Sequence, residues 1–102
     1  MRTAKDPTIR GDLEFYSEQL STNRGNPTML RGLATNLRAG IERVRRLAVQ
    51  ETCPEEYKNS PRRIGLLPVS PEEWWKYYRP VVQHDVSVAE QLLQEYEQAT
   101  NA

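Results

Sequence analysis

Residues 23–46 read NRGNPTMLRGLATNLRAGIERVRR, and this stretch decides the fold. Apolar side chains recur every three or four residues along it and just beyond it, at Leu30, Leu33, Leu37, Ile41, Val44 and Leu47. At about 100° per residue these positions form one stripe, as an amphipathic helix requires. Asn26-Pro27 supplies an N-cap and a first helical residue. The sequence therefore predicts a long helix that opens at Asn26-Pro27 and ends near residues 50–53.

Other helix starts are marked by the same combination of a capping residue and a proline. Asp6-Pro7 predicts a first helix over about residues 7–21, and Ser70-Pro71 predicts a third helix that carries the sequence WWKYYR. Pro80 should kink or break that helix, because proline lacks an amide hydrogen and clashes with the preceding turn. A last helix is therefore expected over about residues 81–99, with Val82 and Val86 on its inner stripe.

The segment between the second and third helices is expected to be extended. Its three helix-opposing residues are Pro61, Gly65 and Pro68. We expect its apolar residues to lie across the bundle as a lid; they are Ile64, Leu66 and Leu67. The predicted fold is all-α: a small four-helix bundle forming one domain over residues 1–102, with residues 1–6 as a flexible start and residues 51–70 as the connector.

The totals fit a single small protein of modest core. The chain has 102 residues, 37% of them hydrophobic, and it has one cysteine, Cys53. No apolar run approaches the roughly 20 residues that a membrane-spanning helix needs, and the first residues lack the apolar stretch of a signal peptide. With a single cysteine, no internal disulfide is expected. We expect a cytoplasmic protein with no membrane partner.

Positive charge is concentrated in the second helix. Six of residues 23–46 are arginine and only Glu42 is acidic, although the whole chain balances 14 basic against 14 acidic side chains. Arg31, Arg38 and Arg45 are spaced by seven residues, so they form a row that drifts by about 20° per step. We call these three residues the arginine row. Further cations lie at Arg24, Arg43, Arg46, Arg62 and Arg63.

A row of this length suits a polyanion better than a small ligand, because arginine binds phosphate through paired planar donors. Such contacts position a nucleic-acid backbone without reading its bases. The alternative is internal pairing with the acids of the last helix, Glu90, Glu95 and Glu97. Residues 1–53 hold nine basic and six acidic groups and residues 54–102 hold five and eight. This asymmetry supports internal pairing, or head-to-tail association of copies, just as well as nucleic-acid binding.

Four aromatic residues crowd into one helical segment: Trp74, Trp75, Tyr77 and Tyr78. One stripe of a helix cannot bury all four. We expect Trp74 and Tyr78 in the core, and at least one of Trp75 and Tyr77 partly exposed. Exposed Trp, Tyr and Arg side chains are typical interface anchors, and rings beside cations can also stack bases. The candidate interface residues are therefore Trp75, Tyr77 and Arg79.

No pattern in the chain predicts catalysis. His84 and Asp85 are neighbours, so on a helix they diverge by about 100°. With one histidine and one distant cysteine, neither a metal site nor a Cys–His pair is expected. The glycines are scattered and form no phosphate-binding loop. We expect a protein that is not an enzyme and uses no cofactor.

The stretches NRGNPTMLRG and LRAGIERVRR resemble the small helical subunits of CRISPR effector complexes, over about 25 residues. The resemblance implies a non-enzymatic subunit, repeated along a larger antiviral complex, that holds guide RNA or displaced DNA through backbone contacts. The residues it points to are Arg24, Arg31, Arg38, Arg43, Arg45, Arg46, Arg62 and Arg63. The aromatic segment has no counterpart in that family.

Two functions of different class follow from the sequence. The first is a non-catalytic helical subunit that binds RNA or single-stranded DNA through its backbone, without sequence preference, beside other subunits or copies of itself. The second is a protein-interaction module, such as an adaptor or a phage-encoded inhibitor, in which the arginine row and exposed aromatic residues meet an acidic partner. A small phage packaging or structural protein is a third.

Overall fold

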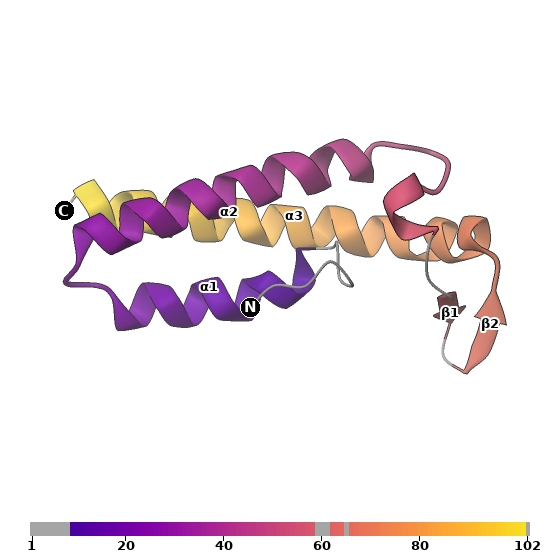
Figure 1. The fold of residues 1–102 in the computed structure, drawn as a ribbon, viewed down its shortest axis with the longest axis horizontal. Coiled ribbons are helices and arrows are strands. Elements are labelled where there is room, and N and C mark those ends of the chain that lie inside the picture. The colour runs from indigo at the N-terminus through magenta and orange to yellow at the C-terminus, as the bar shows by residue number, and fades with distance from the viewer. Residues whose placement is uncertain (1–8, 59–61, 65, 102) are drawn as a thin grey trace.

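The chain folds into a helical rod with principal extents of 47 × 23 × 19 Å (Figure 1). This computed structural model describes residues 9–58, 62–64 and 66–101. Its described elements, in chain order, are α1 (Arg10–Thr22), α2 (Pro27–Ala48), the 3-10 turn η1 (Glu55–Tyr57), β1 (Arg62–Ile64), β2 (Leu67–Val69) and α3 (Pro71–Asn101). The all-α class is confirmed. The expected flexible start, residues 1–6, lies outside the described part.

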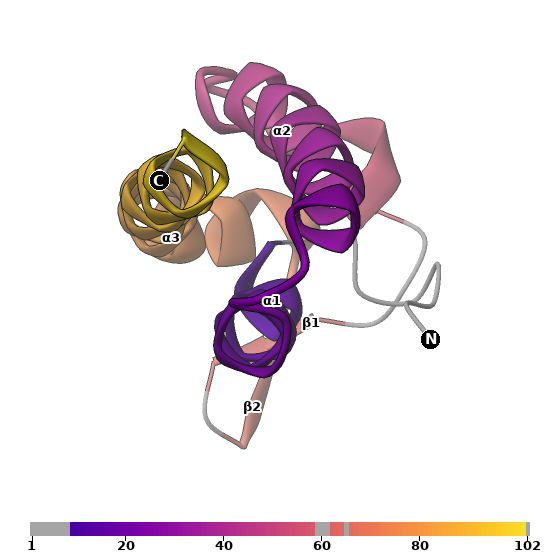
Figure 2. The same ribbon diagram turned by 90° about the vertical axis from the view of Figure 1, so that its left-hand side faces the viewer.

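Helix α2 is the central element, and its start is the predicted one. The side chain of Asn26 accepts a hydrogen bond of 3.2 Å from the amide of Met29, and Pro27 occupies the first turn. The helix ends at Ala48, slightly earlier than expected. Its predicted stripe packs against α3 and α1 around a common core, as the view along the rod shows (Figure 2). The buried residues of α2 are Leu30, Ala34, Leu37, Ile41, Val44, Leu47 and Ala48.

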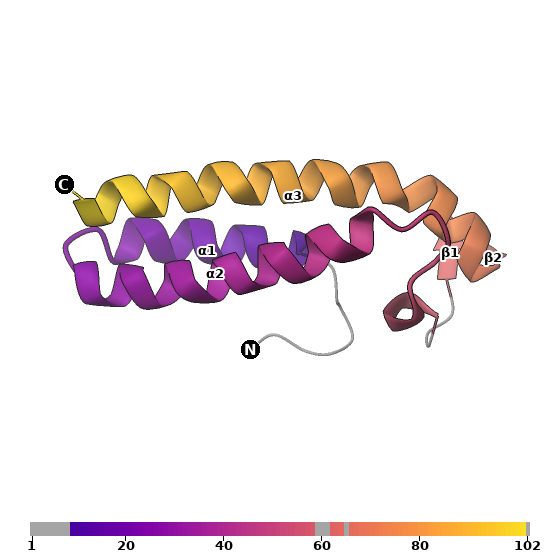
Figure 3. The same ribbon diagram turned by 90° about the horizontal axis from the view of Figure 1, so that it is seen from above.

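Helix α3 runs unbroken from Pro71 to Asn101, so the prediction of a fourth helix is wrong (Figure 3). Pro80 lies inside it and is exposed, on the side of the helix opposite the buried Ala89. There its ring meets no packed neighbour, and water can satisfy the carbonyl that loses its amide partner. Proline costs a helix interior about 3 kcal/mol. Burial of Trp75 before Pro80 and of Val82 after it offsets this cost.

The end of α2 is held by three side chains of α3. The indole nitrogen of Trp75 donates to the carbonyl oxygen of Gln50 at 2.8 Å. Arg79 Nε and Gln83 Nε2 both donate to the carbonyl oxygen of Ala48 at 3.0 Å. The last carbonyls of a helix have no partner within it, and a cation there is favoured by the helix dipole. These bonds therefore fix the register of α3 on α2.

Polar contacts at the first residue and in the middle of α1 help to hold it on α3. Arg10 donates to the buried Asp85 at 2.9 Å, and this hydrogen bond raises the pKa of Arg10. In the middle of α1, the carbonyl oxygen of Tyr16 accepts from the hydroxyl of the buried Tyr96. The apolar residues Ile9, Leu13 and Leu20 face the core. Because a buried unpaired carboxylate is costly, Arg10 and Asp85 anchor the start of α1.

The connector forms a hairpin rather than a lid. β1 pairs with β2 in antiparallel register, with Ile64 opposite Leu67. Figure 1 shows the hairpin projecting from the end of the rod at the start of α3. Leu66 and Leu67 are exposed, so the expectation that they cover the bundle is wrong. Both strands of the hairpin belong to the connector, since β2 pairs with β1 at residues 62–64.

The burial of Tyr96 makes stability sensitive to alkaline pH. Burial, with a smaller contribution from Tyr16, raises the pKa of Tyr96 from 10.0 to about 12. Neutral Tyr96 therefore stabilises the fold fully below pH 10, and this contribution is lost as the pH rises from 10 to about 12. Tyr96→Phe should lower the free energy of unfolding by about 1 kcal/mol at pH 7 and should flatten its decline above pH 10.

Urea unfolding followed by circular dichroism at a series of pH values measures this effect. Tyr77→Phe is the matched control, because Tyr77 is exposed. An alkaline decline of equal slope in Tyr96→Phe and in the parent would contradict the assignment.

Candidate interaction surfaces

Two of the three residues of the arginine row are paired with acids of α3. Arg38 contacts Glu97 at 3.2 Å, and Arg45 contacts Glu90. The helices run antiparallel, and both sets of partners are seven residues apart, so one register serves both pairs. The alternative of internal pairing is thus realised for Arg38 and Arg45. Glu95, the third acid considered, lines a groove between α1 and α3 instead.

The remaining arginines divide between paired and free. Arg43 contacts Glu56 of η1 at 3.2 Å. Arg24, Arg31 and Arg46 are exposed and make no ion pair with the part of the chain that the structure describes. Arg31 lies one seven-residue step before Arg38, and it takes part in none of the ion pairs of the described residues. Arg62 and Arg63 lie on β1, and their side chains lie outside the described part.

These interhelical ion pairs are open to water. Every side chain in the pairs of Arg38, Arg43 and Arg45 is between 39% and 52% exposed. Exposed pairs typically contribute only about 0–1 kcal/mol and weaken with salt. The pairs Arg38–Glu97 and Arg45–Glu90 are therefore solvated, and their arginines can exchange one anionic partner for another. We call this line of contacts between α2 and α3 the seam.

Of the three candidate interface residues, only Tyr77 lies open on the surface, 60% exposed. Trp75 is fully buried beside Tyr57, with ring centroids 5.1 Å apart, so it cannot stack bases or anchor a partner. Arg79 is engaged with the last carbonyls of α2 and is half-buried. Trp74 is buried as expected and stacks on Tyr78 with centroids 4.8 Å apart, while Tyr78 is only half-buried against the core.

The hairpin end carries the most exposed apolar side chains of the described chain. Leu66 is 91% exposed and Leu67 70%. Opposite residues of an antiparallel pair share a face, so Leu67 lies beside Ile64. Ile64 and Tyr77 together line a shallow hollow of about 420 Å³, with Glu73 and Lys76 at its side. We call Ile64, Leu66, Leu67 and Tyr77 the hairpin patch.

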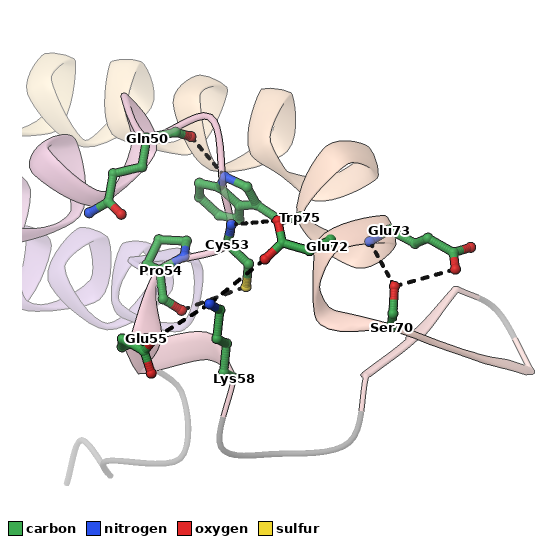
Figure 4. A network of polar contacts seen from close by, with 9 residues as sticks. All are labelled: Gln50, Cys53, Pro54, Glu55, Lys58, Ser70, Glu72, Glu73 and Trp75. Atoms are coloured by element: carbon green, nitrogen blue, oxygen red, sulfur yellow. Dashed lines mark hydrogen bonds and ion pairs between the residues drawn. The ribbon is translucent and has the colours of Figure 1, made fainter.

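The base of the hairpin is held by polar contacts (Figure 4). Glu72 accepts from the amide of the buried Cys53 at 3.0 Å and contacts Lys58 at 3.8 Å. Ser70 caps α3 by accepting from the amide of Glu73 at 3.2 Å, and Glu73 reaches back to its hydroxyl at 3.3 Å. The Ser70 hydroxyl therefore accepts from the backbone of Glu73 and donates to its side chain, and the first of these bonds is an N-cap. The patch is therefore carried on a fixed helix start.

Pro68 restricts how the hairpin meets a partner. It lies opposite Arg63 in the register. A proline has no amide hydrogen, so its nitrogen faces away from β1 and offers nothing to an added strand. Docking at this end therefore relies on side chains rather than on extension of the sheet along β2.

His84 and Asp85, neighbours in the sequence, have separate surroundings. His84 is exposed, and Asp85 is engaged with Arg10. Among residues 9–58, 62–64 and 66–101, no three His, Cys, Asp or Glu side chains gather to hold a metal ion. None of the described helices is both long and apolar enough to cross a membrane. A further hollow of about 570 Å³ lies over Met29 and Gly32 on the outer side of α2.

Comparison with known proteins found no family model, no curated protein and no solved structure that matches this chain.

A double-mutant cycle measures how strongly the seam holds. For Arg45→Ala and Glu90→Ala we expect a coupling free energy of about 0.2–1 kcal/mol in low salt, falling further in high salt. Arg10→Ala with Asp85→Ala is the matched comparison and should couple more strongly, because Asp85 is buried. Urea unfolding of the single and double variants gives both coupling free energies. Equal values in the two cycles would contradict the weak coupling expected for Arg45 and Glu90.

Proposed function

We propose that this chain is a non-catalytic protein-interaction module whose contact surface is the hairpin patch. The observation that carries the proposal is the exposure of Leu66 at 91% and of Leu67 at 70%, next to Ile64, which lines a hollow together with Tyr77. A neighbouring group of exposed apolar residues, rimmed by polar ones, is typical of a contact surface, whereas single exposed residues are ordinary. Glu73 and Lys76 form such a rim here.

Burial energetics supports the same surface. Complete burial of one leucine side chain contributes about 1.5–3 kcal/mol, and a few anchors carry most of the free energy of a protein interface. The other large aromatic residues of this region, Tyr57, Trp74 and Trp75, are already buried. At this end of the rod, the apolar side chains still open to a partner are therefore those of the hairpin patch.

The proposal is tested by exchanging both tip leucines for polar residues. Leu66→Ser with Leu67→Ser should reduce, by at least about tenfold, the amount of protein partner recovered with the chain from native cells, since two anchors are lost. The helical circular dichroism spectrum should be unchanged, because neither leucine is in the core. Quantitative mass spectrometry measures the recovered partner.

Val49→Ser is the matched control, because Val49 is 66% exposed on another part of the molecule. The proposal fails if the leucine variant and the control recover the same partners in the same amounts.

A second candidate is backbone binding to nucleic acid, the function that the resemblance to CRISPR small subunits implies. Arg24, Arg31 and Arg46 favour it, because they are exposed without an ion pair among the described residues. Phosphates would extend this site by displacing Glu90 and Glu97 from the seam. These glutamates therefore compete with the nucleic acid in this hypothesis.

Removing the competing acids should strengthen such binding. Glu90→Gln with Glu97→Gln should bind a single-stranded DNA of mixed sequence more tightly than the parent, with a log–log salt slope steeper by about 1.4, or 0.7 for each arginine released. Fluorescence anisotropy at several salt concentrations measures both quantities. Replacement of the arginine row should weaken binding alike on all sequences.

The control carries the same change in net charge elsewhere: Glu14→Gln with Glu18→Gln on α1, both exposed. If this control gains as much affinity as the seam variant, the arginine row is not the site.

A further inference from the structure

We propose that the partner of the hairpin patch is a second copy of this chain, docked end to end about a two-fold axis. This inference rests on the proposed interaction function and names its partner. In a two-fold contact the same surface of both copies must be complementary to itself. The end of the rod that carries the hairpin has this property in shape and in charge.

The shape is self-complementary because a projection and a hollow lie on the same end of the molecule. Leu66 and Leu67 stand out at the hairpin, while Ile64 and Tyr77 line the shallow hollow of about 420 Å³. A two-fold axis between two such ends brings the leucines of each copy to the hollow of the other. Every member of the hairpin patch is then used twice, once in each direction.

The charge is self-complementary as well. Glu73 and Lys76 carry opposite charges, are both exposed and line the same hollow. The two-fold arrangement sets Lys76 of each copy toward Glu73 of the other. Opposite charge around an apolar centre favours the correct orientation of docking, and a net charge of zero leaves no overall repulsion between copies.

The same features limit the assembly to a weak dimer. A standard interface uses about 20–30 residues on each side, and the hairpin patch has far fewer. A two-fold contact closes on itself, so no further copy is added at this end. Pro68 also prevents the two hairpins from joining along β2 into one sheet.

A lipid surface is a different occupant for exposed leucines beside arginines. The structure favours the protein partner, because the opposite charges of Glu73 and Lys76 beside the patch can pair with a second copy but give no net attraction to anionic headgroups. The two occupants are separated by the experiment below.

Sedimentation equilibrium of the purified chain, from roughly 10 µM to 1 mM, tests the proposal. The average mass of the wild-type chain should rise from 11.8 kDa toward twice that value as concentration increases. Leu66→Ser with Leu67→Ser should stay at the monomer mass throughout, and Val49→Ser should behave as wild type. Tyr77→Ser, on α3 rather than on the hairpin, should weaken association by at least about tenfold.

Three results would overturn the proposal. The first is a wild-type chain that remains monomeric over the whole range. The second is a leucine variant that associates as the parent does, which would place the contact elsewhere. The third is a monomer that cosediments with vesicles of phosphatidylcholine and phosphatidylserine only when both leucines are present. If self-association fails, the broader interaction function is still tested by the recovery of partners from cells. That experiment depends on the same leucines but does not require self-association.

Discussion

The fold depends on how α3 holds the end of α2. Trp75, Arg79 and Gln83 reach three successive carbonyls that α2 cannot satisfy within itself. Once these bonds fix the register, the seven-residue spacing of the acids on α3 matches that of the arginines on α2. The same register places the start of α3, and with it the hairpin, at one end of the rod. The charged seam and the apolar end are both consequences of this capping.

The sequence predicted the helices well wherever a single pattern, such as apolar periodicity with a cap, determines the local structure. Periodic apolar residues and the Asn26-Pro27 start predicted α2 closely, because an amphipathic stripe with a cap has few other solutions. The signal failed at Pro80, where the local preference of proline to break a helix competes with burial on both sides of it. Whether a helical proline is tolerated depends on which side faces water, and that follows from tertiary packing. The hairpin was missed because each of its strands has only three residues.

The candidate sites were less readable than the helices. The sequence offered pairing with acids near the end of the chain as an alternative for the arginine row. It is realised for Arg38 and Arg45, and which arginines are paired depends on the register of two helices. Trp75 and Tyr77 differ in exposure because they lie about 200° apart on α3, and the side that carries Trp75 packs against η1 and the end of α2. A pattern on one helix contains no information about which of its sides meets such neighbours. Leu66 and Leu67 were noticed, and only their direction was wrong.

The unbroken course of α3 through Pro80 has a mechanical consequence. The carbonyl of Lys76 lacks its usual amide partner, so the turn between residues 76 and 80 is the softest part of the longest helix. Trp75 lies before this turn and Gln83 after it, and both hold the end of α2. The hydrogen bonds to the end of α2 therefore bridge the weakened turn from outside α3. A force applied at the hairpin is transmitted through these bonds into α2. Without them, the parts of α3 before and after Pro80 could bend relative to each other.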